Sequence, residues 1–546
     1  MGDMASRTEV LIIGSGPAGL QAGYFFNQRG IDFRILERAP HVSAFLRKFP
    51  RHRTFISVNK VNTGLSNPDM RMRYDWNSLI NDEEILFGHH SKAYFPKADD
   101  FTAYAERFAR PFADKIRCES DVVEISKEED TFSVICADGS VHHAAKVIVA
   151  TGVSQAWESG IEGIELAENY TEFDPTPELY DNKRVLILGK GNSAFETADS
   201  LIPHAAAIHV MSPNPLRLAW QTHFVGHLRA VNNNFLDTYQ LKSQNAVIDA
   251  EVFRIEREGD ALKVSAHMRA AEGHDIVLTY DHVIACTGFQ FDNSIFAPDL
   301  QPEMRHYAKF PVMGADWQSD KVSGLYFAGT IMQSCDYRKT MSGFIHGFRH
   351  NVQTLCDFVE ADLRGTPLPT DVVDLDPEAL NRHIINRLST SSAIFLQPGF
   401  LSDVFVLEGS ERGKCYRDVP VQWAAEQARF ADVDRLQITL EYGDFGKDTL
   451  HVKRQHNMFG KEPDAFLHPV VRHMRGAEVL AEMHLADHLD ADWRPRAERD
   501  QTAATVLEMT FQDAGGTKPP SEVATEQLRH FLTGIAGLDR VATAAE

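Results

Sequence analysis

The N-terminal part of the chain alternates short apolar runs with glycine-rich turns. Residues 9–13 form an apolar run of the length expected for a buried parallel strand, and it leads directly into the glycine turn at 14–19. The pattern then predicts a helix over 20–29 and a second strand over 33–36, which ends at Glu37. Strand, glycine turn, helix and a second strand ending in an acid are typical of a dinucleotide-binding unit.

Each glycine of this turn has a distinct task in such a unit. Gly14 permits the tight turn, Gly16 lets the backbone approach a pyrophosphate, and Gly19 lets the helix pack closely on the strand. The phosphates would lie on the amides at the start of the helix, and Glu37 would accept hydrogen bonds from a ribose. The expected cofactor contacts are Gly14, Gly16, Pro17, Ala18, Gly19, Glu37 and Arg38.

A second copy of the pattern begins at residue 184. An apolar run at 184–188 opens into the turn at 189–194, a helix is predicted over 195–201, and the next strand, 208–211, ends at Ser212 rather than at an acid. A 2′-phosphate would meet no repelling carboxylate there, so the pattern favours NADPH, with NADH as the alternative. The residues expected to hold this nucleotide are Gly189, Gly191, Asn192, Ser193, Ser212 and Arg217.

Two nucleotide-binding patterns in one chain indicate that one domain interrupts the other. The apolar strands at 147–149 and 283–286 each run into a Thr-Gly turn, and a third, at 325–327, runs into Ala-Gly-Thr. These strands would return the chain to the first sheet, where their ends reach a flavin. They add Thr151, Gly152, Gly288 and Gly329 to the expected cofactor contacts.

We therefore predict an α/β fold with two nested, three-layer Rossmann-like dinucleotide-binding domains and a C-terminal α+β accessory domain. An insertion at 213–250 is longer than a nucleotide fold needs and is expected to form a wall of the substrate site. The expected domains are an FAD-binding domain at 1–155 and 285–365, an NAD(P)H-binding domain at 156–284, and the accessory domain at 370–546.

Composition narrows the range of partners. The 77 Asp and Glu residues against 55 Lys and Arg give a net charge of −22, which repels phosphate backbones and anionic membranes. No run approaches the ~18 apolar residues of a membrane span, and no signal peptide precedes the first strand. We expect a cytoplasmic protein with no nucleic-acid or membrane partner. The sequence is compatible with an oligomer.

The six cysteines are scattered along the chain without a Cys-x-x-Cys pair. This argues against a disulfide scaffold, a zinc site and a dithiol redox centre. His223 and His227 have the spacing of metal ligands on a helix, but no third ligand stands near them, so no metal is expected. Any electron chemistry must therefore come from a bound cofactor.

The two glycine turns and the paired Thr-Gly strands together resemble the two-dinucleotide-binding-domain flavoproteins, the superfamily of flavin-containing monooxygenases and pyridine-nucleotide disulfide reductases. The missing cysteine pair argues against the disulfide-reductase branch. Outside the turns, the chain resembles the FAD-dependent oxidoreductase-domain proteins of endoplasmic-reticulum degradation, and bacterial N-oxygenases of amino acids look similar. The segments that carry this resemblance are 50–53, 73–79, 93–96, 191–198, 236–243, 336–339 and 343–349.

The resemblance implies a flavoenzyme in which NADPH passes a hydride to FAD and the reduced flavin reacts with O2 to form a C4a-hydroperoxide. It favours a monooxygenase that N-hydroxylates the amine of a small substrate, such as the amino acid aspartate. The alternative is an NAD(P)H reductase or oxidase that releases hydrogen peroxide or serves a protein partner. From a different class, a flavin-bound interaction protein also fits the resemblance.

A monooxygenase needs hydrogen-bond donors over the flavin in a dry site. The resemblance implies Asn59 as the first candidate and Asn77 as the second, although an asparagine that stabilises a turn fits each position equally well. Arg338 belongs to a charged cluster suited to a flavin edge or an anionic substrate, or else to a solvated loop. Trp76 and Phe344 lie in two of the resembling segments and are expected to contact cofactor.

Overall fold

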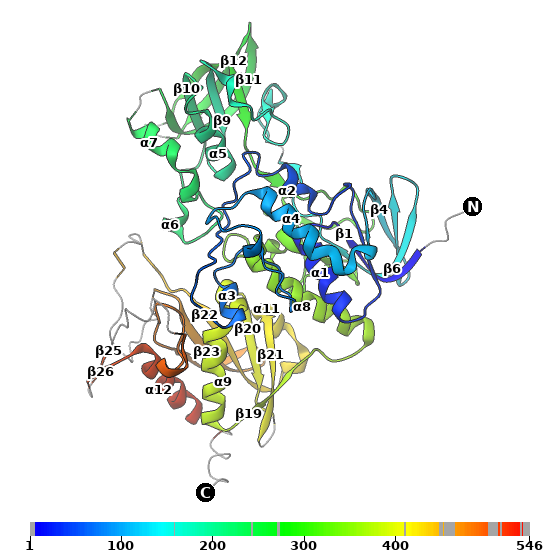
Figure 1. Ribbon diagram of the computed structural model, residues 1–546, viewed down its shortest axis with the longest axis vertical. Coiled ribbons are helices and arrows are strands. Elements are labelled where there is room, and N and C mark those ends of the chain that lie inside the picture. The colour runs from blue at the N-terminus through cyan, green and yellow to red at the C-terminus, as the bar shows by residue number, and fades with distance from the viewer. Residues whose placement is uncertain are drawn as a thin grey trace.

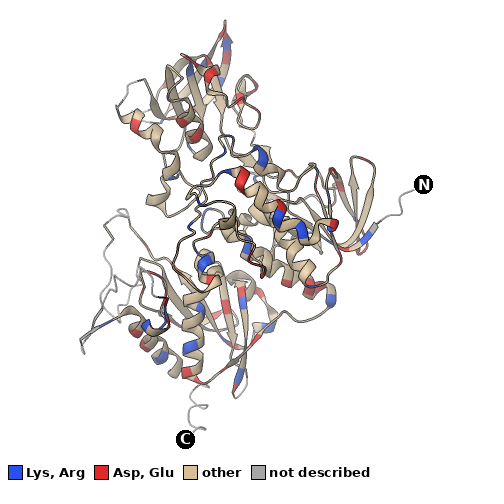
Figure 2. Ribbon diagram, viewed as in Figure 1, with Lys and Arg blue, Asp and Glu red and all other residues tan. Residues whose placement is uncertain are grey.

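The computed structural model describes residues 6–157, 159–241, 244–269, 273–408, 411–446, 451–452, 465–500, 511–513, 516–535 and 538. The chain forms three bodies, which Figure 1 shows one above another, with the nested second dinucleotide-binding unit at one end and the C-terminal part at the other. Charged residues of both signs are interspersed over all three bodies (Figure 2). Within the described residues, no helix combines the length and the apolarity needed to cross a bilayer.

The first sheet is built around a parallel core. Its central strands pair in register, Ile12 with Ile35 on one side and with Ile148 on the other. Helices α1 (Pro17–Gln28), α4 (Ala98–Ala109) and α8 (Ile345–Arg364) pack on it through one apolar core. The strands are β1 (Ser6–Ile13), β2 (Phe33–Leu36), β3 (Ile116–Arg117), β4 (Val122–Glu128), β5 (Thr131–Cys136), β6 (Val141–Val149) and β18 (Leu325–Phe327).

Helix α1 begins at Pro17, three residues before the predicted start. Proline is favoured at the first position of a helix because its missing N–H needs no intrahelical partner there. The helix thus begins within the glycine turn itself, so the backbone amides that follow Gly16 belong to its first turn.

The second sheet has the same parallel core with an antiparallel extension. Helix α5 (Asn192–Leu201) follows the strand at 184–188, and α6 (Ala219–Thr222) and α7 (Asn234–Leu241) come from the insertion. Its strands are β8 (Glu168–Asn169), β9 (Arg184–Leu188), β10 (Ala207–Ser212), β11 (Ala246–Glu258), β12 (Ala261–Met268), β13 (Asp275–Tyr280) and β14 (His282–Ala285).

The C-terminal part is an antiparallel six-stranded sheet with helices packed on it. Trp423 of α11 (Val421–Glu426) contacts Phe358 of α8 at 5.1 Å between ring centroids, so this sheet is joined to the first body. Helices α9 (Pro377–Thr390) and α12 (Pro520–Thr533) share a second apolar core with it. Its strands are β19 (Asp371–Asp374), β20 (Leu401–Val406), β21 (Arg412–Pro420), β22 (Asp434–Glu441), β23 (His468–Arg475) and β24 (Glu478–His484).

Candidate flavin site and active site

The turn between β1 and α1 has the three backbone properties that the sequence predicts. Gly14 has φ +101°, and a Cβ there would lie 2.8 Å from the carbonyl oxygen of Ala150. A Cβ at Gly19 would lie 2.0 Å from the carbonyl oxygen of Gly14. A Cβ at Gly16 would meet nothing within 4 Å, so the space over the start of α1 is open to a ligand.

Glu37 at the end of β2 holds this turn from the side. Its carboxylate accepts hydrogen bonds from the backbone N–H of Ser15 at 2.9 Å, from the Ser15 hydroxyl at 2.7 Å and from the N–H of Ala39 at 3.0 Å. Glu37 is buried, whereas Arg38 beside it is exposed. The acid therefore lies next to the glycine turn, at the strand end where the sequence predicts the contact with a ribose.

A cavity of about 470 Å³ opens from the glycine turn and has mostly apolar walls. Its walls come from the starts of α1, α5 and α8, from the ends of the first sheet's strands, and from residues 43–57. The volume is within the range of cofactor sites. It brings together ten of the residues predicted from the sequence, namely Gly16, Pro17, Ala18, Asn77, Thr151, Gly152, Asn192, Ser193, Gly329 and Phe344.

Three buried oxygen atoms of the cavity residues have no hydrogen-bond partner among the described residues: Oγ of Ser43, Oδ1 of Asn77 and Oγ1 of Thr151. The Asn77 amide nitrogen is used, since it donates to the carbonyl oxygen of Val58 at 3.2 Å. A buried polar atom without a partner costs free energy, and the polar edge of a flavin would supply the missing partners. The glycine turn, the apolar walls and these three atoms fit FAD.

Asn59, Arg338 and Trp76 do not line this cavity. The Asn59 amide donates to the carbonyl oxygens of Ser91 at 2.9 Å and Ala93 at 3.1 Å, so it holds that loop. Arg338 is exposed and has φ +58°. The Trp76 indole N–H donates to a backbone carbonyl at 3.1 Å, and its ring packs elsewhere.

The second glycine turn repeats the first. Gly189 has φ +121°, and a Cβ there would lie 2.3 Å from the carbonyl oxygen of Cys286, whereas a Cβ at Gly191 would meet nothing within 4 Å. Gly288, with φ +95°, lies beyond the end of β14 and outside the cavity. Asn192 at the start of α5 donates to the carbonyl oxygen of His227 at 2.9 Å, which ties the turn to the insertion.

A carboxylate from the neighbouring strand lies beside the strand end at Ser212, and the sequence pattern did not predict it. Asp249 of β11 stands opposite Ser212, and Lys190 of the glycine turn forms an ion pair with it. The Lys190 amine also donates to the carbonyl oxygen of Ser212 at 3.1 Å. Arg217, which follows Ser212 closely in the sequence, is exposed. A local acid is thus present at this corner, but its charge is balanced by Lys190.

Glu196 and Tyr170 form a buried pair for which the sequence predicts no role. Glu196 is 8% exposed, lies on α5 one turn after Ser193, and lines the cavity. The Tyr170 hydroxyl donates to it and itself accepts the N–H of Arg51 at 3.1 Å. Burial raises the pKa of Glu196 to about 7, against the lowering effect of the Tyr170 hydrogen bond. A titrating carboxyl group therefore faces the cavity at neutral pH.

The FAD-free protein is expected to lose stability as the pH rises through about 7. In the unfolded chain Glu196 titrates near 4.5, so between that pH and about 7 the folded state binds the extra proton. The free energy of unfolding should fall by about 3 kcal/mol over this window. Denaturant titrations at about pH 5 and about pH 8 measure this, and Glu196→Gln should lack this part of the fall. Equal pH dependence in both proteins would contradict the assignment.

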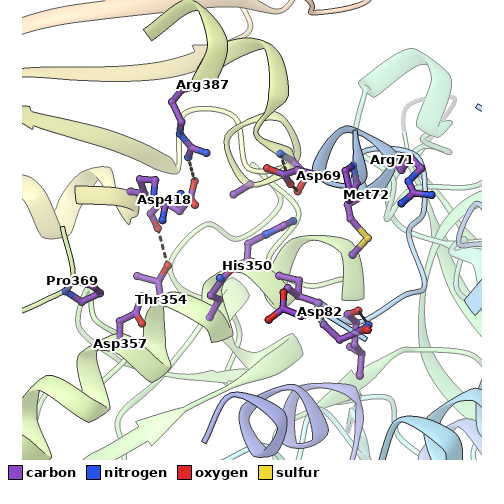
Figure 3. Close-up of a pocket in the computed structure, with 18 of the residues that line it drawn as sticks. Asp69, Arg71, Met72, Asp82, His350, Thr354, Asp357, Pro369, Arg387 and Asp418 are labelled. Carbon is purple, nitrogen blue, oxygen red and sulfur yellow. Dashed lines mark hydrogen bonds and ion pairs between the residues drawn. The ribbon is translucent and has the colours of Figure 1, made fainter. Parts of the chain in front are cut away.

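A second cavity, of about 560 Å³, lies between α3 (Pro68–Met72), α8 and β21 (Figure 3). Fixed polar pairs join its walls. Arg387 forms ion pairs with Asp403 at 2.6 Å and with Asp418 at 3.0 Å, and the Thr354 hydroxyl donates to the Asp418 carbonyl at 2.8 Å. None of the predicted site residues lines it, and the described His, Cys, Asp and Glu side chains form no group that could hold a metal ion. This cavity therefore lies at the interface between the first body and the C-terminal part.

The nested sheets and the two glycine turns define a flavoprotein with two dinucleotide-binding domains. A family model described as pyridine nucleotide-disulphide oxidoreductase matches residues 11–329. The chain belongs to this FAD-binding oxidoreductase family. All six cysteines are free in the structure, and none lines the flavin cavity.

Similarity to individual proteins agrees with this membership. FAD-dependent oxidoreductase domain-containing protein 2 of Mus musculus is 32% identical over 573 residues, which cover 97% of this chain and 84% of the mouse protein. Bacillithiol disulfide reductase Bdr from Staphylococcus aureus has a TM-score of 0.53 at 20% identity, and a flavin-containing monooxygenase from Stenotrophomonas maltophilia has 0.51 at 18%. Each match covers 65% of this chain and 99% of the other. The predicted nested fold and the resemblance to this superfamily are confirmed.

Proposed function

We propose that this chain is an FAD-dependent, NAD(P)H-driven monooxygenase that N-hydroxylates the amine of a small substrate, with amino acids such as aspartate as the first candidates. The observation that carries the proposal is the flavin cavity, which is mostly apolar and is lined by the starts of α1, α5 and α8. None of its lining residues is a cysteine, so a disulfide relay would find no thiol there. Dioxygen or a protein partner could then accept the electrons, and the proposal takes dioxygen.

When bound, FAD would accept a hydride from the nicotinamide nucleotide and reduce O2. The part of the chain would be to hold this chemistry in a dry place. The turn around Gly16 would bind the pyrophosphate, and Asn77 and Thr151 would pair with the polar atoms of the flavin. Water would be excluded by six phenylalanines of the cavity wall, Phe45, Phe49, Phe55, Phe289, Phe344 and Phe348.

NADPH is the nucleotide that we favour over NADH. The end of β10 has Ser212 in place of the usual acid, and the neighbouring Asp249 is neutralised by Lys190. The exposed Arg217 is available to a 2′-phosphate. Asn192 and Ser193 line the flavin cavity from α5, so a nucleotide on that helix would meet the flavin.

Rapid mixing of the NADPH-reduced, yellow protein with oxygenated buffer tests this function. We expect flavin reoxidation in two resolved phases, with one amino acid accelerating the second phase and yielding a hydroxylamine product. The same measurement with NADH as reductant tests the nucleotide preference. Reoxidation in a single phase with stoichiometric hydrogen peroxide, unchanged by every amine tried, would instead establish the oxidase or reductase alternative.

A further inference from the structure

Arg229, on the insertion, lies beside the flavin cavity and has no anionic partner among the residues that the structure describes. Its backbone N–H donates to the Asn192 side chain at 3.0 Å, which fixes it next to the start of α5. Its guanidinium lies over the ring of Trp76, with the carbon Cζ 5.4 Å from the ring centroid. The guanidinium forms no hydrogen bond or ion pair with any residue that the structure describes.

His346, near the start of α8, contacts the same Trp76 ring and has two ring nitrogen atoms without a partner among the described residues. It is 2% exposed and stacks on the Trp76 ring with 4.3 Å between centroids and 21° between planes. Neither ring nitrogen has a hydrogen-bond partner among the described residues. Burial and the charges of Arg349 and Arg229 keep the pKa of His346 well below its usual value, so the ring is neutral. A neutral imidazole offers one donor and one acceptor.

This cluster of Arg229, Trp76 and His346 borders the flavin cavity through one further ring. Phe344 lines the cavity and stacks on His346 at 5.8 Å with 16° between planes. Phe224 of the insertion also contacts Phe344, with 6.0 Å between ring centroids. A ligand held at the cluster would therefore end near the wall of the flavin cavity.

The cluster has the chemistry of an anion site. Partial burial of a guanidinium without a counter-ion costs free energy, and burial indeed lowers the pKa of Arg229. The chain carries 22 more acidic than basic residues, so internal carboxylates were available to pair it. A planar guanidinium pairs with a carboxylate or a phosphate through two parallel hydrogen bonds, and a carboxylate is the anion that an amino-acid substrate would bring.

We propose that Arg229, Trp76 and His346 bind a carboxylate group of the substrate. The proposal deepens the proposed function, because it takes the flavin cavity as the place where that substrate reacts. Arg229 would pair with the carboxylate, the His346 N–H would donate to it, and Trp76 would keep both side chains in position. The substrate class is then amines that carry a carboxylate a few bonds from the nitrogen, and simple alkyl amines are excluded.

Equilibrium titration of the oxidised, FAD-loaded protein tests this without turnover. Succinate, L-aspartate and the uncharged succinamide serve as probes, followed by the flavin absorbance and tryptophan fluorescence. We expect both carboxylates to bind and the diamide to fail. Arg229→Gln should weaken carboxylate binding by at least roughly tenfold, and Arg229→Lys should weaken it less. Arg254→Gln is the control, because Arg254 pairs with Glu162 at the surface of the second sheet and should bind carboxylates normally.

Three results would overturn the proposal. Equal binding of succinate and succinamide would show that the site does not recognise a negative charge. Unchanged carboxylate binding by Arg229→Gln would show that Arg229 does not bind the carboxylate. A parallel loss of NADPH affinity in Arg229→Gln, measured by flavin reduction, would assign the guanidinium to the nucleotide phosphates instead. These binding measurements involve no reaction with oxygen. Failure of the proposed monooxygenase reaction can therefore be distinguished from failure of the carboxylate site.

Discussion

Gly16→Ala is expected to give a folded protein that no longer retains FAD. Gly16 has φ −66°, which alanine adopts without strain, and a Cβ there would touch no protein atom within 4 Å. The methyl group would instead occupy the space that a pyrophosphate needs over the start of α1. The ratio of flavin to protein absorbance after purification should fall by at least roughly tenfold, while the thermal midpoint of the FAD-free protein should stay within about 2 °C of wild type.

Two neighbouring glycines serve as contrasts in this experiment. Gly14→Ala and Gly19→Ala should lose both the flavin and stability, because each Cβ would meet a backbone oxygen at 2.8 Å and 2.0 Å. Gly160→Ala is the matched control, since its Cβ also meets nothing within 4 Å and lies outside both glycine turns. A wild-type ratio of flavin to protein absorbance in Gly14→Ala or in Gly16→Ala would contradict the cofactor assignment.

The glycine turns could be predicted because each glycine answers a backbone demand that is local in sequence. A left-handed φ at Gly14, an open approach at Gly16 and a close contact at Gly19 follow from the strand and helix on either side. The accessory domain was predicted only as α+β. Its strand order depends on pairings such as Asp371 with Cys415, which carry no sequence signal of their own.

The candidate site was predictable only where it follows these turns. The sequence ranks Asn59 before Asn77, yet loop carbonyls accept hydrogen bonds from the Asn59 amide, whereas an oxygen of Asn77 in the cavity wall has no partner among the described residues. The Glu196–Tyr170 pair and the Arg229–Trp76 contact each join two segments far apart in the chain. Such contacts depend on how the helices, strands and loops pack in three dimensions, which periodicity and motif spacing do not encode.

Arg349→Met is expected to destabilise the folded protein by about 3–5 kcal/mol and to weaken FAD binding. Arg349 on α8 is fully buried and donates to three backbone carbonyls, those of Asp75 at 2.8 Å, Ser78 at 2.6 Å and Met72 at 2.6 Å. Burial lowers its pKa to about 10, so it keeps its charge at neutral pH. Methionine fills similar space but leaves three buried oxygens without a donor.

The effect should extend to the flavin because of what the bound loop carries. The segment from Met72 to Ser78 holds Trp76 and Asn77, so its position relative to α8 sets both the Trp76–His346 stack and the unpaired oxygen of Asn77. Urea titrations and flavin content measure the two losses, with Arg254→Gln as the surface control. Arg349→Lys keeps a charge but not the fork of donors, so it should fall between. Wild-type stability and colour in Arg349→Met would show that α8 does not hold this loop.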